Sequence, residues 1–586
     1  MGTKPKIWPC DDEGSERFPV FTRANAGEAY VEVASPLGWS TFGRHSFEPA
    51  YRGALYEMGA FTPEEFKPVG QCEAMGCFGG YIYLNASVAR VIGARIPGLS
   101  VEAIDASFFG DYPDVPPYRP DPRDENPQRT AALGVWLKSL FGADPLGDTQ
   151  RDALRVDALA GTRPDFQKMS NASLLEYFHT LIGDVRHLDK RHVLNIYGCN
   201  ALIGLIAQTS QAAGAAHLAA KATAAVGGVE SAAQPLHLWE LSREVASSPV
   251  CSAAFDQGVD GLLDRLRASG DRGAERFLRR WDEFIERWGF MGPSIWDLRS
   301  ATYRTDPEIA LRMLDRARRA PDASSPAARS ATLVAERETA IAEIERRLAD
   351  DPQRRGQFAE AARCARDHLA ARELSKVYMT RLMEEARAPL RELGHRLVRQ
   401  GLLTRWDHVL LVTDDEATAF IADPGAYLGL IDERAARLQV LMSKEPPFVF
   451  EGDPPPLSAY RDRGQGRVER ARAGTELKGI GASPGRYTGR ARVITSLSAD
   501  SELEPGEVIV AVTTDAPWAA LFLAAGAVVV ETGSVISHAA IISRELGIPA
   551  AVSVAAATRR IRDGALITVD GNTGSVIVHD HAAGRV

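Results

Sequence analysis

The chain has 586 residues, of which 45% are hydrophobic and 25% are charged. This is the composition of a folded globular protein too long for one hydrophobic core, so we expect two or three domains. A net charge of −9, with no basic stripe and no long apolar run, argues against nucleic acid and a membrane as partners.

The N-terminus lacks the apolar core of a secretion signal, and the six cysteines form no disulfide framework. We therefore predict a cytoplasmic protein with free thiols and no bound metal. Residues 1–20 are expected to form a tail. After it, Tyr30–Val33 and Gly80–Leu84 have the composition of short strands joined by proline-rich connections.

From Phe166 to about Glu445 the chain is dominated by Ala, Leu, Arg and Glu at helical spacing, which predicts a helical body. Residues 451–475 combine a Pro-Pro-Pro run with a charged, Gly-containing stretch. Such a segment suits a hinge, although an ordinary exposed loop has the same composition.

One histidine stands between a turn and a predicted helix near the C-terminus. Gly526–Val530 is predicted to be a buried strand, and the residues from His538 to Leu546 have the apolar spacing of a helix. His538 would then lie near a helix N-terminus, where free backbone N–H groups favour an anion. An imidazole nitrogen in that position is suited to attack a phosphoryl group. The alternative is a structural histidine beside a capped helix.

The stretch from Glu531 to Pro549 resembles the mobile phosphohistidine domain of PEP-utilising enzymes, such as PEP synthase and rifampin phosphotransferase. Only Ser534 and Ser543 differ from the residues usual in the motif. The resemblance extends over residues 476–586 and implies a compact swivelling β/α domain in which His538 is the catalytic, phosphorylated residue. It also implies a phosphate-binding turn and helix N-terminus formed by Thr532, Gly533, Ser534 and Ser537.

Residues 21–450 resemble the substrate-binding domain of the same family more weakly, first at Ala24–Glu28 and Ser35–Ser40. The segment Gly289–Leu298 aligns with a family segment that commonly carries His, Arg and Glu, where this chain has Phe290, Met291 and Ile295. Loss of these groups puts the usual acceptor chemistry in doubt, because a transferring phosphoryl group needs positive donors. The candidate substrate residues are Trp39, Tyr81, Tyr83, Asp189, His192, Asn200, Phe290, Met291, Asp297 and Arg299.

Ordinary structural roles remain open for several of these candidates. Asp189, His192 and Asn200 could share one helix face and activate a hydroxyl, or belong to a solvated face with ion pairs. Tyr81 and Tyr83 could line a pocket or pack in a core. The predicted fold class is thus a multidomain α+β protein, with a large, mainly helical substrate-binding body and a C-terminal swivelling β/α phosphohistidine domain.

Family members receive phosphate from an ATP-grasp domain or a phosphoenolpyruvate-binding barrel, and we find neither pattern in this sequence, nor a Walker A motif. The expectation is a phosphotransferase component with no permanently bound cofactor. A separate ATP-grasp protein using ATP and Mg²⁺ would charge His538, with ATP favoured over phosphoenolpyruvate, and the phosphoryl group would pass to a hydroxyl or phenol of a small molecule. A phosphorylation-coupled dehydratase of a secondary-metabolite-like substrate and a non-catalytic phosphocarrier are the alternatives.

Overall fold

The computed structural model describes residues 6–109, 112, 114–226, 230–294, 296–322, 325–463, 469–495, 503–514, 518–533 and 537–579. It divides the chain into two compact units, each assembled from separate stretches of sequence. Unit 1 comprises Met1–Gly198, Ile295–Arg299 and Leu374–Arg467, and unit 2 comprises Cys199–Ser294, Ser300–Glu373 and Val468–Val586. Two of the boundaries between the units fall inside long helices, α9 (Ile182–Ala212) and α17 (Pro352–Arg399). The domain boundaries expected from the sequence stay predictions.

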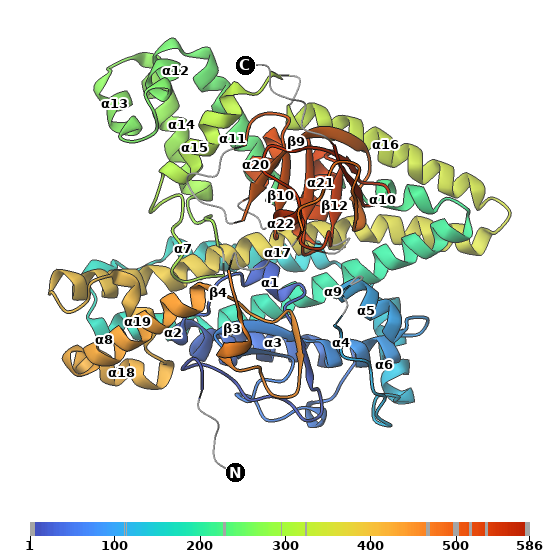
Figure 1. Cartoon of the computed structure of the whole chain (residues 1–586), viewed down its shortest axis with the longest axis horizontal. Coiled ribbons are helices and arrows are strands. Elements are labelled where there is room, and N and C mark those ends of the chain that lie inside the picture. Colours follow the sequence, from blue (N-terminus) through green and yellow to red (C-terminus); the bar gives the residue numbers. More distant parts are fainter. Residues whose placement is uncertain are drawn as a thin grey trace. The chain divides into compact units, whose positions relative to one another are not determined.

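Unit 1 is mainly helical around a four-stranded antiparallel sheet in the order β2-β3-β1-β5. The strands are β1 (Val20–Thr22), β2 (Met75–Phe78), β3 (Tyr81–Asn85) and β5 (Val449–Glu451), and a second small sheet pairs β4 (Lys444–Glu445) with β6 (Arg461–Asp462). Its other helices, shown in Figure 1, are α1 (Ala26–Ala29), α2 (Pro36–Gly38), α3 (Glu48–Glu57), α4 (Ala86–Arg95), α5 (Val101–Phe109), α6 (Pro127–Ser139), α7 (Pro145–Gly161), α8 (Asn171–Thr180), α18 (Asp414–Ala422) and α19 (Leu428–Met442).

Two predictions for the first part of unit 1 have different outcomes. The strand expected over Gly80–Leu84 is present as β3. The prediction of a strand over Tyr30–Val33 is wrong, because Tyr30 ends α1 and the residues after it are irregular. Trp8 and Cys10 already belong to the hydrophobic core of unit 1, so the chain is packed well before residue 21.

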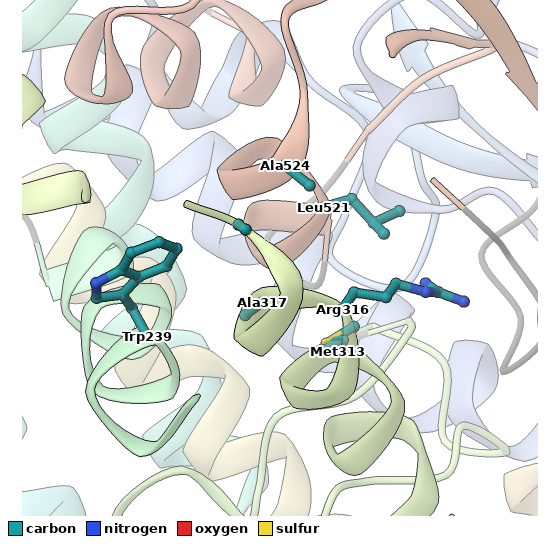
Figure 2. Close-up of a pocket in the computed structure, with 7 residues that line it drawn as sticks. Trp239, Met313, Arg316, Ala317, Leu521 and Ala524 are labelled. Atoms are coloured by element: carbon teal, nitrogen blue, oxygen red, sulfur yellow. The ribbon is translucent and has the colours of Figure 1, made fainter. Parts of the chain in front are cut away.

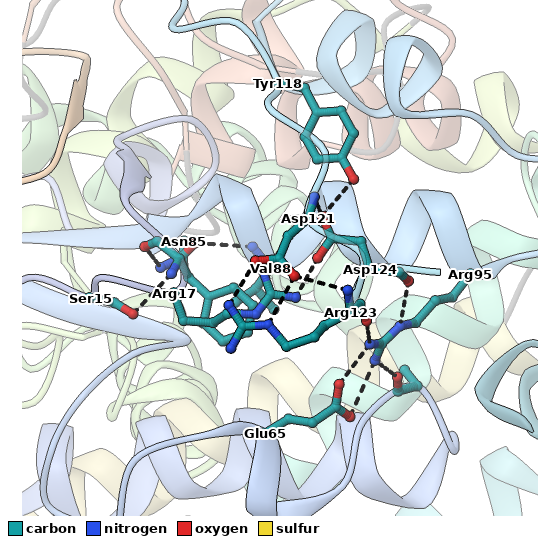
Figure 3. A network of polar contacts seen from close by, with 12 residues as sticks. Ser15, Arg17, Glu65, Asn85, Val88, Arg95, Tyr118, Asp121, Arg123 and Asp124 are labelled. Carbon is teal, nitrogen blue, oxygen red and sulfur yellow. Dashed lines mark hydrogen bonds and ion pairs between the residues drawn. The ribbon is translucent and has the colours of Figure 1, made fainter. Parts of the chain in front are cut away.

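The proline-rich connection after α5 is held by a buried polar network (Figure 3). The Asp124 carboxylate accepts hydrogen bonds from the Tyr118 hydroxyl (2.7 Å) and the Asp121 N–H (3.0 Å). The fully buried Arg95 of α4 donates to the Asp124 carbonyl (3.0 Å) and pairs with Glu65 (2.6 Å). These bonds satisfy backbone groups that a proline-rich segment cannot pair in a sheet.

Unit 2 contains an eight-stranded mixed sheet in the order β7-β14-β13-β9-β10-β11-β12-β8. Its four middle strands, β9 (Arg486–Ile494), β10 (Val508–Ala511), β11 (Ala527–Val530) and β12 (Ala550–Val552), are parallel to one another. The strands β10 and β11 are entirely buried, which fits their continuous apolar sequences. The outer strands are β7 (Glu476–Lys478), β8 (Ile480–Ser483), β13 (Leu566–Asp570) and β14 (Ser575–Val578).

Three short helices connect the strands of this sheet: α20 (Ala519–Ala524), α21 (His538–Leu546) and α22 (Ala557–Arg560). The rest of unit 2 is helical, as Figure 1 shows for α10 (Ala219–Ala222), α11 (Glu230–Ser247), α12 (Pro249–Asp256), α13 (Leu262–Ala268), α14 (Arg272–Trp288), α15 (Glu308–Arg319) and α16 (Pro326–Arg347). The fold class is confirmed as multidomain, mainly helical and with mixed sheets, whereas swivelling stays a prediction. Among the described residues, no helix is both long and apolar enough to span a membrane.

Candidate functional site

The predicted phosphoryl carrier lies where the parallel strands of unit 2 end. The polypeptide leaves β10 through Thr513 and Thr514, and leaves β11 through Thr532 and Gly533 before entering α21. Because β10 and β11 are neighbours and run in the same direction, both exits lie at one edge of the sheet. Ligands of α/β sheets bind at the carboxyl ends of such strands.

His538 is the first residue of α21, as the sequence predicts. The helix begins there because Ser537 adopts an extended backbone and its hydroxyl accepts from the Ala540 N–H (3.4 Å). It ends at Gly547, whose φ of 65° favours glycine. The imidazole therefore lies at the positive end of a helix dipole.

The residue His538 is 5% exposed, and two side chains contact its ring. Its Nδ1 lies 3.4 Å from the Thr514 hydroxyl oxygen, and the Phe522 ring from α20 meets it edge-on with centroids 6.1 Å apart. Neither residue belongs to the histidine motif itself, because both lie earlier in the chain, before β11. These two contacts restrict the orientation of the ring.

The predicted phosphate-binding turn is described at three of its four residues. Gly533 approaches Ser537 and Val552 so closely that a Cβ at position 533 would lie 3.0 Å from the Ser537 hydroxyl oxygen. Its carbonyl accepts from the Ser553 hydroxyl, and the Thr532 N–H donates to the Val512 carbonyl (2.9 Å). Ser534 lies outside the described residues. The phosphate-binding role of all four stays a prediction.

The helix α21 is buried along its whole length within unit 2. The Arg544 Nε donates to the Ala482 carbonyl (2.7 Å), and burial lowers the pKa of this guanidinium to about 10. The Glu545 carboxylate accepts from the Val226 N–H (3.3 Å), and burial raises its pKa to about 7, opposed by that bond and by Arg337. Ile541 packs with Cys199, Val226 and Leu369. These contacts fix the helix that carries His538.

A small pocket lies beside α20, between this helix and α11 and α15 (Figure 2). It is lined mainly by apolar side chains, with one guanidinium at its wall. The lining residues are Trp239, Met313, Arg316, Ala317, Ala320, Leu521 and Ala524.

Three aromatic candidates in unit 1 donate hydrogen bonds from their side chains to other groups of the protein. The Tyr81 hydroxyl donates to the Leu441 carbonyl (2.7 Å) and the Tyr83 hydroxyl to that of Pro447 (2.9 Å), while neither side chain is exposed. The Trp39 indole donates to the Asp12 carboxylate (2.7 Å). These hydrogen bonds satisfy the polar groups of three side chains that lie in the hydrophobic core. The role of these residues in substrate binding stays a prediction.

The candidates on α9 share a face but do not form one cluster. The His192 Nδ1 lies 2.9 Å from the Ser375 hydroxyl, whereas Asp189 is 8% exposed and burial raises its pKa to about 8. Asn200 is half-buried. Since a helix rises about 1.5 Å per residue, Asn200 lies roughly 16 Å along the axis from Asp189. Only Asp189 and His192 are near enough to act on one small ligand.

The residues of the altered segment Gly289–Leu298, and Arg299 after it, lie in two different environments. Phe290 and Met291 are buried in the turn after α14, where the Met291 carbonyl accepts from the Tyr303 N–H (2.8 Å). Asp297 and Arg299 belong to unit 1 and pair with each other, with Nε 3.0 Å from Oδ1. Arg299 also donates to the Val33 carbonyl. Ile295 lies outside the described residues. No group of three or more His, Cys, Asp or Glu side chains suited to a metal occurs among the described residues.

Comparison with known protein families gives two matches. The family described as "PEP-utilising enzyme, mobile domain" matches residues 503–574, which include His538 and both strand exits. The chain resembles this family. The family described as "Rifampicin phosphotransferase fourth domain" matches residues 192–373, a stretch that holds most of the helices of unit 2. The resemblance predicted from the sequence is therefore confirmed.

Individual relatives support the same likeness. An uncharacterized protein of Mycobacterium tuberculosis is 27% identical over 97% of this chain and 62% of its own length. A rifampicin phosphotransferase of a Streptomyces species is 32% identical over 58% of this chain and 39% of its own length. The prodigiosin synthesizing transferase PigC of Serratia marcescens is 38% identical over 32% of this chain and 21% of its own length. The chain thus spans about 62% of the first of these relatives, and phosphoryl transfer is supported in general form.

Proposed function

We propose that this chain carries a phosphoryl group on His538 and delivers it to a hydroxyl of a small organic molecule. The single observation that carries the proposal is the position of His538, at the N-terminus of α21 and at the carboxyl edge of the parallel strands. The phosphorylated ring would place its negative charge against free backbone N–H groups and the helix dipole. The likeness to the mobile domain of PEP-utilising enzymes supports this chemistry.

The Thr514 hydroxyl gives a reason for the choice of ring nitrogen. If the Nδ1–H of His538 donates to the Thr514 oxygen, the lone pair lies on Nε2, which becomes the nucleophile. Nε2 then takes the phosphoryl group from the donor and releases it to the acceptor. Phe522 limits rotation of the ring during both steps.

The donor in this proposal is ATP with Mg²⁺, bound by a separate ATP-grasp protein that phosphorylates His538. The phosphohistidine domain would swing between that donor and an acceptor site in the remainder of the chain. A phosphate ester is the product. Phosphoenolpyruvate as donor, elimination of the ester to an alkene, and a purely carrying role are the alternatives that an experiment has to separate.

The test is phosphorylation of the purified chain with γ-³²P-labelled ATP and Mg²⁺, with and without candidate ATP-grasp proteins, and in parallel with labelled phosphoenolpyruvate. We expect an acid-labile label that requires the partner and is absent from His538→Ala. His217→Ala is the matched control, because this exposed histidine lies in the helical part of unit 2. An acid-stable label, or an equal label on His538→Ala, would contradict the proposal.

A further inference from the structure

Three aromatic rings from distant segments meet in unit 1. The Tyr30 ring lies 5.7 Å from the Trp296 ring and 6.2 Å from that of Phe47, and Phe47 and Trp296 are 5.8 Å apart. Phe47 is buried, whereas Tyr30 and Trp296 are partly exposed. The trio therefore forms an aromatic wall at the margin of the hydrophobic core of unit 1, in which Phe47 is buried and the other two residues are partly buried.

The segment that positions Phe47 has an unusual backbone. Residues Trp39–Phe47 form a π-helix, η1, between α2 and α3. A Cβ at Gly43 would lie 2.3 Å from the Trp39 ring, so the segment accommodates this ring only with glycine there. π-helical turns are rare and occur frequently at functional sites. This geometry is independent of the aromatic contacts and marks the same place.

One buried polar group of the wall, the Trp296 indole N–H, lacks a hydrogen-bond partner among the described residues. The side chain of Asp189 is buried as well, with an exposed fraction of 8% for the residue. The Asp189 carboxylate adds to the effect of burial in raising the pKa of the Tyr30 phenol, so these two groups lie near each other. An unpaired buried donor lowers stability, and a ligand that pairs with it recovers that loss.

We propose that Tyr30, Phe47, Trp296 and Asp189 form the binding site for a flat, apolar, hydroxyl-bearing molecule of the phenol class. The aromatic wall would stack on the ring of the ligand, and its hydroxyl would bond to the Asp189 carboxyl. The Trp296 N–H would donate to a second oxygen of the ligand. Burial raises the pKa of Asp189 to about 8, so its carboxyl is mostly protonated at pH 7 and favours an uncharged ligand.

The catalytic role of this site rests on the proposed function, although its binding role does not. In the transfer step, the acceptor hydroxyl gives its proton to the Asp189 carboxylate and its oxygen forms a bond to phosphorus. The P–N bond to His538 breaks, and its electron pair returns to the imidazole nitrogen. The products are a phosphate ester, a neutral histidine and a protonated Asp189, which returns its proton to water.

The test is equilibrium binding of 2-naphthol to the unphosphorylated chain by calorimetry at pH 7, with 2-methoxynaphthalene as the probe that cannot donate a hydrogen bond. We expect the naphthol to bind about tenfold more tightly than its ether. Asp189→Leu should bring this ratio to within about twofold of unity, and Trp296→Phe should weaken naphthol binding about fivefold. Asp432→Asn and Trp136→Phe are matched controls, an exposed carboxylate and a partly buried indole elsewhere in unit 1.

Equal binding of both probes to the wild-type chain, no binding, or unchanged binding in both variants would overturn the assignment. His538→Ala should bind the naphthol as the wild type does. Failure of phosphorylation at His538 with the naphthol binding pattern intact would remove the proposed function and leave this site standing. The reverse result would remove the site alone.

Discussion

His538 in unit 2 and Asp189 in unit 1 are both almost fully buried, yet their surroundings differ in the charge that they favour. His538 lies at a helix N-terminus beside the Thr514 and Ser537 hydroxyls, which suits a phosphoryl anion. Asp189 lies within α9 beside aromatic rings, and burial alone raises its pKa to about 8. The first environment suits an anion, whereas burial in the second favours the protonated carboxyl and raises the pKa of the proposed base. Because of this difference, we propose that the phosphoryl carrier and the acceptor site lie in different parts of the chain.

The largest expected effect separates the two regions outright. His538→Ala should abolish phosphorylation, because no other side chain at the strand exits offers an imidazole. Asp189→Asn should be phosphorylated to the wild-type extent, since it changes only the acceptor side. Quantified label per chain after incubation with donor and partner measures both. Loss of the label in Asp189→Asn would contradict the claim that Asp189 acts only on the acceptor side.

Asp189→Asn should instead slow transfer to the acceptor by about 10²–10⁴-fold, the usual contribution of a general base. The wild-type rate should rise as pH increases towards 8, because the carboxylate fraction grows as Asp189 loses its proton near that pKa. The variant should lack this rise. The measurement is single-turnover release of phosphate from the phosphorylated chain between pH 6 and 9. An equal slope in both proteins would assign the base to another group.

A smaller effect is expected at Thr514. Thr514→Val keeps the shape of the side chain and removes its hydroxyl, so the His538 ring loses the contact at Nδ1. The loss of one hydrogen bond, worth about 1 kcal/mol, should slow phosphorylation about fivefold. Thr514→Ser should restore most of the rate. Equal rates for all three proteins would show that the ring is oriented by Phe522 and the helix alone.

A change in stability is also expected at Glu545, and the same kind of change is expected at Asp189. The folded state raises the pKa of Glu545 from 4.5 to about 7, so native protein binds more protons and stability falls as pH rises through this interval. Glu545→Gln should remove that loss and gain at most about 3 kcal/mol on the wild type above pH 7. Thermal unfolding at pH 5 and pH 8 measures it, with exposed Glu360→Gln as control. Asp189→Asn should likewise remove a loss of stability, which for Asp189 extends up to about pH 8.

The two regions also differ in how far the sequence predicts them. The strand before His538, the helix from His538 to Leu546 and its capping serine follow from a single local stretch, because strand–turn–helix units form from neighbouring residues. The Tyr30–Phe47–Trp296 wall could not be predicted, since it joins segments brought together only by the tertiary fold. Asp189 was a candidate on helical spacing alone. Its burial beside Tyr30 became visible only in the structure.

The most direct test of the central claim is peptide mass spectrometry under neutral conditions on the chain charged by its donor. The account predicts one phosphate on the peptide that contains residue 538, located on the histidine ring and lost in mild acid. Phosphate on a serine or threonine instead, or none on this peptide while phosphate reaches an acceptor, would contradict it.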